Sequence, residues 1–451
     1  MKIIIVGTGK VGSILVEQLS SENHDIVVID KNADALKQIT ERYDVMGVIG
    51  NGATVEIQKE AGVEKSDLLI ATTDLDECNL LACLLARNLG ARHTIARVRN
   101  PEYASQMSYL RSDLGLSMTI NPELEAAAEI SRVLRYPSAL KINPFARGRV
   151  EMIEIKVSED SPIAGLSLIQ LRNKYQLKIL VCAVDREDDL FIPGGNFVLQ
   201  AGDRITLIGA PADVNTFFEK IGIFKGKIKS VMIVGAGKIG YYLTRQLLGM
   251  KIAVKIIEQN PARCREICEL LPEATVICGN GSNQELLTSE GIHTTDSFVA
   301  LTGLDEENMV ISVCANTAGV KKVITKVNNV SLAPVLDQLS LDTVISPKRL
   351  TADRIVRYAR AMQSSADSRI ETLYKLIDGK AEAVEFRVAG DSEVLNKPIK
   401  DLKFKPQILI ACIVRQGTTI IADGSTVIQK GDSVIVISGR EALNSIEEIL
   451  L

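Results

Sequence analysis

Ile3-Ile4-Ile5-Val6-Gly7-Thr8-Gly9-Lys10-Val11-Gly12 joins an unbroken apolar run to a Gly-x-Gly-x-x-Gly loop, and this stretch decides the fold. An apolar run without alternation is typical of a parallel strand that is buried on both faces. After the loop, apolar residues recur at helical spacing as far as about residue 21. We therefore predict a strand, a tight loop and a helix, which together form the first unit of a Rossmann-like sheet.

The same loop occurs a second time, as Gly235-Ala236-Gly237-Lys238-Ile239-Gly240. Gly235 follows Gly7 by 228 positions, and the later motifs keep an offset of 228 or 229. The matched pairs are Asp30 with Glu258, Asn51 with Asn280, and Arg97 with Lys326. A duplicated domain is expected from this, because the repeat is too long for a solenoid unit. The halves, 1–224 and 231–451, are joined by residues 224–230, a short basic segment typical of a surface linker.

Each half is predicted to hold a parallel-sheet domain and a small α+β module. The expected sheet strands lie near residues 2–6, 26–30, 45–49, 67–71 and 93–98, and again near 231–235, 253–258, 274–278, 297–301 and 322–327. Their alternation with helices predicts a doubly wound α/β sheet. In the first small module the expected strands lie near 151–157, 178–184, 197–199 and 204–208. The expected domains are 1–140, 141–224, 231–368 and 369–451.

The composition is that of an ordinary globular protein, with 46% hydrophobic and 24% charged residues. No apolar run approaches the roughly 20 residues that span a bilayer, and the N-terminal strand shows no signal-peptide pattern. The formal net charge of -4 gives no reason to expect nucleic acid as a partner. Cys264 and Cys268 lie one helical turn apart and could touch a soft metal, although reduced thiols are the favoured interpretation.

The glycine loop and the acid after the second strand are typical of a dinucleotide site. Gly7 permits a tight turn, Gly9 lets backbone approach a pyrophosphate, and Gly12 lets the helix pack closely on the sheet. The helix N-terminus then offers N–H groups to the phosphates. Asp30 lies 18 residues after Gly12 and can accept hydrogen bonds from a ribose. Its carboxylate would repel a 2′-phosphate, which favours NAD(H) or an adenine nucleotide over NADP.

Polar residues at the ends of later strands extend the expected site. Thr73 and Asp74 follow the fourth strand, at the edge where open α/β sheets bind ligands. Arg97 ends the fifth strand and pairs either with a phosphate or with a neighbouring Asp. Asp76, Glu77 and Asn79 are expected to cap and charge the N-terminus of the next helix, with contact between Asn79 and the ligand as the alternative. Lys10 either places a cation near the phosphates or is a solvated residue at a helix start.

The sequence gives little support for catalysis. None of the three His lies near a Ser, Cys or carboxylate cluster, and no nucleophile or metal motif is visible. The leading hypothesis is a ligand-gated regulatory protein without turnover. An NAD-dependent oxidoreductase and a soluble nucleotide sensor that acts on another enzyme remain as alternatives.

Two such glycine-loop units, each followed by a small module that ends in Gly-Asp and an apolar strand, resemble tandem RCK (KTN) domains. The module ends are residues 201–208 and 430–437, and segments 95–103 and 121–123 also look typical of the family. The resemblance covers essentially the whole chain. It implies a homo-oligomeric gating ring on the cytoplasmic face of the membrane, acting on an integral membrane potassium channel subunit of the Trk type. Binding of NAD(H), ATP or ADP would change the shape of the ring and thereby the pore.

The resemblance also implies the ligand contacts. In the first half they are Gly7, Thr8, Gly9, Lys10, Val11, Gly12, Asp30, Asn51, Thr73, Asp74 and Arg97. In the second half they are Gly235, Ala236, Gly237, Lys238, Ile239, Gly240, Glu258, Asn280, Thr302 and Lys326. Related subunits bind a divalent cation through an acid in the Asn-Pro-Glu region, which would be Glu123, although Lys348 stands at the matching position of the second half.

The two halves differ at their expected sites. Asp74 becomes Gly303, and Arg97 becomes Lys326, which keeps the charge but loses the guanidinium fork. We therefore expect the first site to prefer NAD(H) and the second to prefer ATP or ADP. The helix expected at 123–135, which Pro137 ends, is in the family a crossover that pairs one Rossmann unit with another; the alternative is a helix that packs on its own sheet.

Overall fold

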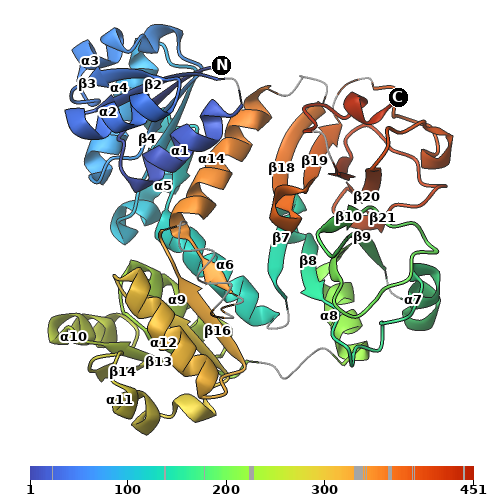
Figure 1. Cartoon of the computed structure of the whole chain (residues 1–451). Helices are drawn as coiled ribbons and strands as arrows, with labels where there is room; N and C mark the ends of the chain where they lie inside the picture. Colours follow the sequence, from blue (N-terminus) through green and yellow to red (C-terminus); the bar gives the residue numbers. More distant parts are fainter. Residues whose placement is uncertain are drawn as a thin grey trace. The chain divides into compact units, whose positions relative to one another are not determined.

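The computed structural model of the chain describes residues 1–451 apart from 23, 137–138, 177, 223–227, 330–338, 340, 342, 364–367, 389, 391 and 440–441 (Figure 1). Pro137 and most of the expected linker therefore lie outside the described residues. Contacts divide the chain into two compact units. One holds Met1–Ser131 with Lys229–Ala359, and the other holds Arg132–Ile228 with Arg360–Leu451.

The first unit begins with a six-stranded sheet in the order β3-β2-β1-β4-β5-β6, whose strands all pair in parallel. The strands are β1 (Lys2–Val6), β2 (Asp25–Asp30), β3 (Met46–Ile49), β4 (Leu68–Ala71), β5 (His93–Arg97) and β6 (Met118–Ile120). The helices are α1 (Lys10–Ser20), α2 (Ala33–Arg42), α3 (Val55–Glu60), α4 (Asp76–Leu89), α5 (Pro101–Asp113) and α6 (Pro122–Arg135). The prediction of a Rossmann-like parallel sheet is confirmed. Strands β1 to β3 are added toward one edge of the sheet and β4 to β6 toward the other, so the strand order switches between β1 and β4. Sheets of this kind bind ligands at that switch point.

A second parallel sheet in the same unit repeats this order, as β14-β13-β12-β15-β16-β17. Its strands are β12 (Ser230–Val234), β13 (Ala253–Glu258), β14 (Thr275–Cys278), β15 (Ser297–Ala300), β16 (Lys322–Lys326) and β17 (Val344–Ile345). Its helices are α9 (Lys238–Gly249), α10 (Pro261–Leu270), α11 (Gln284–Ser289), α12 (Asp305–Thr317) and α14 (Pro347–Gln363). The sixth strands, β6 and β17, were not expected, because two or three residues are too few to show a pattern.

The central strands explain the unbroken apolar runs. Ile3, Ile4 and Ile5 of β1 have no exposed surface, so both faces of the strand are covered by helices. β12 repeats this with buried residues from Val231 to Val234. Each central strand thus holds its glycine loop rigidly at the carboxyl end of the sheet.

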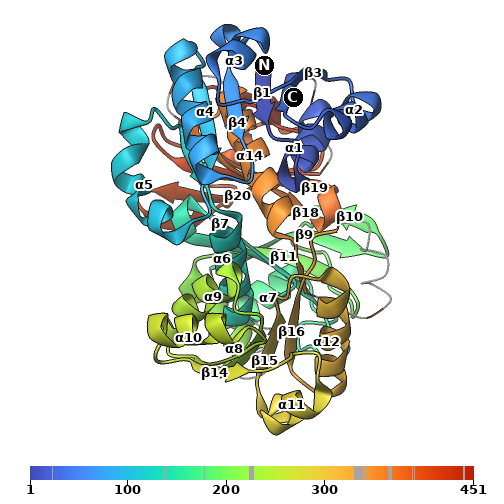
Figure 2. The ribbon, with the colours of Figure 1, turned by 90° about the vertical axis from the view of Figure 1, so that its left-hand side faces the viewer.

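The helices α6 and α14 are exchanged between the two sheets (Figure 2). Asn121, directly before α6, lies with its Nδ2 3.2 Å from Oη of Tyr242 on α9. Ser131 on α6 lies with its Oγ 3.7 Å from Sδ of Met250, the residue that follows α9. In the other direction, residues of α14 contact the first domain through Gln18 Nε2 to Asp353 Oδ1 (2.9 Å) and His93 Nδ1 to Tyr358 Oη (3.1 Å). The crossover interpretation of the helix near 123–135 is therefore confirmed.

The second unit contains two antiparallel sheets, one from each small module, in the orders β10-β9-β11-β8-β7 and β18-β19-β22-β20-β21. The first sheet comprises β7 (Lys141–Phe145), β8 (Val150–Lys156), β9 (Ile179–Arg186), β10 (Asp189–Phe191) and β11 (Arg204–Gly209), with helices α7 (Leu168–Tyr175) and α8 (Pro211–Lys220). The second comprises β18 (Ser368–Leu376), β19 (Ala381–Val388), β20 (Ile408–Arg415), β21 (Thr418–Ile421) and β22 (Ser433–Ser438). The expected strand at 197–199 is wrong, because Val198 makes only an isolated bridge with Ser167.

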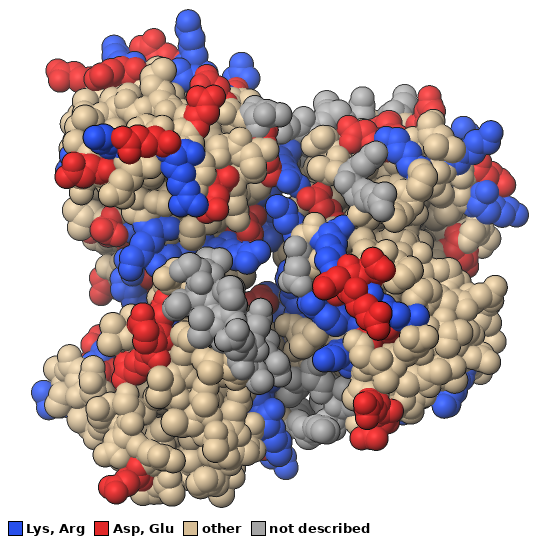
Figure 3. Space-filling view, viewed as in Figure 1, with Lys and Arg blue, Asp and Glu red and all other residues tan. Residues whose placement is uncertain are grey.

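Both small modules contribute to one apolar cluster, which includes Phe145 and Met152 from the first and Leu376 and Ile437 from the second. The modules therefore form a pair within their unit. Among the described residues, no helix is long and apolar enough to cross a lipid bilayer. Acidic and basic side chains are interspersed over the first Rossmann-like domain on the face drawn in Figure 3.

Candidate functional site

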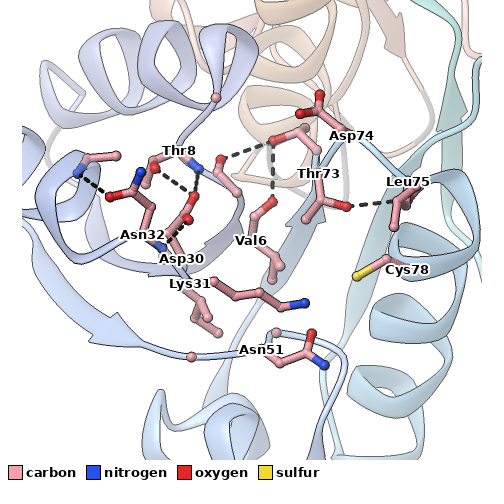
Figure 4. A pocket seen from close by; sticks show the side chains of 17 residues that line it. Val6, Thr8, Asp30, Lys31, Asn32, Asn51, Thr73, Asp74, Leu75 and Cys78 are labelled. Carbon is pink, nitrogen blue, oxygen red and sulfur yellow. Dashed lines mark hydrogen bonds between the residues drawn. The ribbon is translucent and has the colours of Figure 1, made fainter.

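A cavity of about 360 Å³ opens at the carboxyl ends of β1, β2 and β4 (Figure 4). Its walls are Val6, Gly7, Thr8, Gly9, Ile29, Asp30, Lys31, Asn32, Ala35, Gly50, Asn51, Gly52, Thr72, Thr73, Asp74, Leu75 and Cys78. Seven predicted contacts of the first half thus line one hollow, namely Gly7, Thr8, Gly9, Asp30, Asn51, Thr73 and Asp74. Lys10, Val11, Gly12 and Arg97 are not part of its wall.

The three glycines of the loop differ in what a side chain at each position would contact. A Cβ on Gly12 would lie 1.9 Å from the carbonyl oxygen of Gly7, so the start of α1 can pack here only without a side chain. Gly7 has a φ of +99°, which L side chains rarely adopt, and a Cβ there would press on the backbone of Thr73. A Cβ on Gly9 would meet no protein atom within 4 Å. The protein itself therefore gives no steric reason for glycine at position 9.

The second loop repeats all three surroundings. Gly240 packs against the Gly235 carbonyl, with an added Cβ 2.4 Å away, and Gly235 has a φ of +103°. Gly237 again has nothing within 4 Å of an added Cβ. The open side of the middle glycine is thus a property of both copies, as expected where backbone must approach a ligand.

Asp30 is held by its own loop at the end of β2. Its Oδ2 accepts the Thr8 amide and the Thr8 hydroxyl, each at 2.6 Å, and its Oδ1 accepts the Asn32 amide at 2.8 Å. Burial alone would raise the pKa of this carboxyl. The Thr8 hydroxyl and the backbone amides outweigh burial and hold the pKa of Asp30 below its ordinary value. The acid is therefore ionised and aimed at the loop, with part of its acceptor capacity left for a ligand.

Glu258 has the same position in the second half with fewer partners. Its Oε2 accepts the Ala236 amide at 2.8 Å and its Oε1 accepts the Asn260 amide at 2.8 Å. Ala236 has no hydroxyl to match that of Thr8, so one more lone pair of the carboxylate is open. Arg263 donates from Nε to the Ala236 carbonyl at 2.7 Å and places a guanidinium at the loop. The matching residue of the first half is Ala35, which lines the cavity.

Arg97 lies behind the cavity wall. It donates to the Thr73 carbonyl oxygen and pairs with Asp74 at 3.2 Å, which is the internal ion pair that the sequence left open. Burial lowers the pKa of Arg97, with a smaller lowering from Arg99, while Asp74 raises it. Lys326 takes the same place in the second half and donates to the Thr302 carbonyl oxygen. Its pKa is lowered, chiefly by burial.

Asn79 binds the protein itself, and the alternative in which it reaches a ligand is not favoured. Its side chain is fully buried and takes part in four hydrogen bonds. Two of these lie between its Oδ1 and the Thr73 amide (2.8 Å) and hydroxyl (2.7 Å). The other two run from Nδ2 to the Thr73 and Arg97 carbonyl oxygens, each at 3.0 Å. Asn79 therefore fixes the ends of β4 and β5 against each other, as Asn308 does in the second half.

Lysines from both halves meet near the first glycine loop. Lys348, at the start of α14, lies beside Lys10, and burial together with Lys10 lowers the pKa of Lys348 to about 8, against the opposing effect of Asp305. Lys326 lowers it further, and the pKa of Lys326 is itself lowered in part by Lys10. Such a group of like charges favours an anion. The exchanged helix thus brings a cation of the second half to the first site.

Glu123, the weak candidate for a metal ligand, accepts from Arg99 Nε at 2.6 Å, and its other carboxylate oxygen is buried without a hydrogen-bond partner. In the part of the chain that the structure describes, no group of three or more His, Cys, Asp or Glu side chains could hold a metal ion. A cation site at Glu123 stays a prediction.

Several wall residues were missed by the sequence interpretation, among them Lys31, Asn32 and Cys78. Asn32 caps α2, with its Oδ1 accepting from the amides of Asp34 and Ala35. Its position directly before a helix was a readable signal. Arg263 was also missed, although a comparison of the two halves at the offset of 228 places it opposite Ala35.

The remaining predicted contacts of the second half follow the same plan. Asn280 comes just after β14, its Oδ1 accepting the Ser282 amide at 2.9 Å, and Thr302 comes after β15, its amide donating to Asn308. Lys238 and Ile239 open α9. Two Rossmann-like sheets with matched glycine loops and matched acids place this chain in the class of proteins with tandem Rossmann-type domains.

Comparison with known proteins identifies the family. The family model described as the TrkA-N domain matches residues 3–122 and 231–347, and the TrkA-C domain matches residues 152–222 and 383–451. The chain is 32% identical over 456 residues to the Trk system potassium uptake protein TrkA homolog 1 of Methanosarcina mazei, covering 99% of each chain. It is 33% identical to the Trk system potassium uptake protein TrkA of Vibrio alginolyticus, covering 94% of this chain and 92% of the relative. The chain belongs to the TrkA family.

Solved structures share the fold. The GsuK channel bound to NAD superposes with a TM-score of 0.65 at 19% identity, over 97% of this chain and 76% of that chain. The crystal structure of the GsuK RCK domain gives a TM-score of 0.64 at 18% identity, over 97% of this chain and 92% of that chain. Both the tandem RCK-type architecture and the suspected family are confirmed.

Proposed function

We propose that this chain is a regulatory subunit without turnover, which binds nucleotides and controls potassium uptake through an integral membrane channel subunit of the Trk type. The single observation that carries the nucleotide sites is the open side of Gly9 and Gly237, each beside a loop-held acid. The names of the relatives, which are Trk potassium-uptake proteins, support the transport role. Its proposed place is the cytoplasmic face of the membrane, in a homo-oligomeric ring.

The proposed ligands are NAD(H) and ATP or ADP. In this proposal Asp30 and Glu258 accept ribose hydroxyls, and the amides at the starts of α1 and α9 would donate to the phosphates. One structure of the same fold is described as bound to NAD and another as bound to ADP. Together with the site residues, this supports both classes of nucleotide.

The two sites are proposed to differ in preference. The Thr8 hydroxyl occupies one lone pair of Asp30, which leaves fewer acceptor positions for a ribose, whereas Ala236 leaves the matching position of Glu258 open. Arg263 adds a cation to the second loop. We assign NAD(H) to the first site and ATP or ADP to the second. The exchange Thr8→Ala with Ala236→Thr should move the two affinities toward each other.

Coupling between the sites is proposed to run through the exchanged helices. Because Lys348 of α14 lies beside Lys10, phosphates bound at the first loop would draw on charge from the second half. A ligand shifts a conformational equilibrium only through different contacts in the two states. We propose that Lys348 supplies such a contact, through a shift of α14 that changes its distance from the loop. The four domains are proposed to end near residues 140, 224, 368 and 451.

Titration calorimetry on Asp30→Ala and Glu258→Ala tests the site assignment. Asp30→Ala is expected to lose NADH binding and Glu258→Ala to lose ATP binding, each with the other ligand retained. Identical losses in both variants would show that the sites are not distinct. Oxidation of bound NADH by any added acceptor at catalytic rates would instead favour an oxidoreductase.

Recovery from membranes tests the partner. The tagged full-length chain should co-purify with an integral membrane potassium channel subunit, and the yield should change when NADH or ATP is added. Co-purification with a soluble enzyme in place of a membrane subunit would support the sensor alternative and contradict the proposal.

A further inference from the structure

Three cysteines gather at the second candidate site, and the matching positions of the first half carry none. Cys264 and Cys268 lie on α10, and Cys278 is the last residue of β14. Their counterparts at the offsets of 228 and 229 are Leu36, Thr40 and Ile49. The thiols are therefore not required by the fold, because the first domain builds the same elements without them.

Cys264 and Cys278 converge on one backbone carbonyl. The Cys264 thiol donates to the Glu258 carbonyl oxygen, with Sγ and O 3.3 Å apart. Gly279, the residue after Cys278, donates its amide to the same oxygen at 2.9 Å, and Cys278 pairs with Glu258 in the β13–β14 register. The Cys264 side chain also contacts that of Cys278, and burial together with this contact raises the pKa of Cys264 to about 11.

The two thiols differ in access. Cys278 lies at the end of an edge strand and is exposed, whereas Cys264 lies on α10 and is buried. An exposed thiol beside a buried one is the arrangement in which the first reacts with an oxidant and the second resolves the product. Cys268 is exposed one turn further along α10 and offers an alternative partner.

We propose that Cys264 and Cys278 form a reversible disulfide, so that the second nucleotide site is a site of redox modification. The oxidant is a peroxide. The Cys278 thiolate attacks one peroxide oxygen and breaks the O–O bond, which gives a sulfenic acid and water after protonation. The Cys264 thiol then attacks the sulfenic sulfur, its proton leaves with the hydroxyl as a second water, and the S–S bond forms. Two thiols are oxidised and one peroxide is reduced to two waters.

The disulfide would act on the acid of the site. It removes the hydrogen bond from Cys264 to the Glu258 backbone and ties the start of α10 to the end of β14, two residues before Asn280. The Glu258 carboxylate is positioned by the Ala236 and Asn260 amides, and Asn260 is the residue that caps α10. Oxidation is therefore expected to weaken nucleotide binding at the second site by tenfold or more. This effect rests on the proposed function, whereas the disulfide itself does not.

Peptide mapping of the full-length chain tests the disulfide. Glu-specific cleavage separates the three thiols, because Cys264 falls in 259–266, Cys268 in 267–269 and Cys278 in 274–285. After treatment with hydrogen peroxide and thiol blocking, the 259–266 and 274–285 peptides should be joined, and a reductant should release them. Cys268→Ser should leave this product unchanged, while Cys264→Ser and Cys278→Ser should abolish it. Unlinked 259–266 and 274–285 peptides, or a product that contains 267–269, would overturn the proposal.

Calorimetry with ATP on the Asp30→Ala background tests the coupling. Oxidation should lower the affinity, a reductant should restore it, and Cys264→Ser should make the affinity insensitive to peroxide. Unchanged affinity in protein shown to carry the disulfide would refute the coupling and leave the modification site. Absence of ATP binding in the reduced protein would refute the proposed second nucleotide site, and the peptide map would still decide the disulfide.

Discussion

Replacement of Gly9 by alanine separates the needs of the ligand from those of the fold. Gly9 precedes α1 with φ −62° and ψ −175°, a conformation open to alanine, and the new methyl group would touch no protein atom within 4 Å. The free energy of unfolding should fall by less than about 1 kcal/mol, the cost of alanine at a helix N-cap. Gly12→Ala places its methyl 1.9 Å from the Gly7 carbonyl oxygen and should cost about 3 kcal/mol or more.

The loss of binding in Gly9→Ala can be estimated from the contacts that the methyl would displace. A hydrogen bond from a backbone amide to a charged phosphate contributes about 1.5–3 kcal/mol. Loss of one or two such bonds should lower the affinity for the ligand by roughly a hundredfold, since a tenfold change in affinity corresponds to about 1.4 kcal/mol. Urea unfolding would measure the stability, and titration calorimetry with NADH and ATP would measure the binding.

A matched control for this test is Gly194→Ala, in the second unit, where an added methyl group also meets nothing within 4 Å. That variant should keep both stability and nucleotide binding. Gly237→Ala should remove the second site in the same way as Gly9→Ala removes the first. If Gly9→Ala bound both nucleotides with the stoichiometry and affinity of the parent chain, the middle glycine would have no ligand role and the reasoning would fail.

Three further predictions concern single side chains. The folded-state pKa of Asp30 is depressed, so its contribution is present above its ordinary value of about 3.8 and is lost as the pH falls through the folded value; the urea midpoints of the parent chain and Asp30→Asn should therefore converge below pH 4. The pKa of Lys348 is lowered to about 8, so the ligand-free chain should gain stability as the pH rises from about 8 toward 10.5, and Lys348→Met should lose this rise in thermal melts. Asn79→Leu removes the hydrogen bonds that Asn79 makes with the part-buried Thr73 amide and the buried Arg97 carbonyl, and it should lower the unfolding free energy by about 3 kcal/mol, as measured by urea titration. A loss below about 1 kcal/mol would contradict the role of Asn79.

The local patterns predicted most of the first unit because its strands are buried on both faces, and such burial leaves an unbroken apolar run in the sequence. Ile3 to Val6 is such a run, and the glycine loop after it predicts the edge of the sheet at which a ligand would bind. The expected strand at 197–199 was wrong because Phe197 and Leu199 pack on the module's core from a loop, while Val198 between them is exposed and makes only an isolated bridge. The sequence patterns alone did not predict which distant elements each helix packs against. For example, the sequence of α14 does not indicate that its Asp353 contacts Gln18, because the two residues lie more than 300 positions apart.

The candidate site shows the same division. The glycines, Asp30 and Thr73 were predictable, since each position is fixed by the geometry of one strand end and the loop that follows it. The orientation of Asn79 was not, because the choice between ligand and protein partners depends on where the end of β5 lies. The lysine cluster was also hidden, as Lys10 and Lys348 meet only through the exchange of helices. Whether the predicted contacts bind a nucleotide stays a prediction for the calorimetry.

The exchange of α6 and α14 also bears on how such a chain could arise. In a half-length chain that ends near residue 224, α6 would have no second sheet to pack against. Two such chains could bury their exchanged helices only by forming a dimer. Fusion of two copies turns that pairing into a property of one polypeptide. After fusion the two halves no longer need identical sequences, so Glu123 and Lys348 can occupy equivalent positions with opposite charge. A symmetric pair of identical chains could never make that distinction, so the duplicated chain is free to hold two sites of different chemistry.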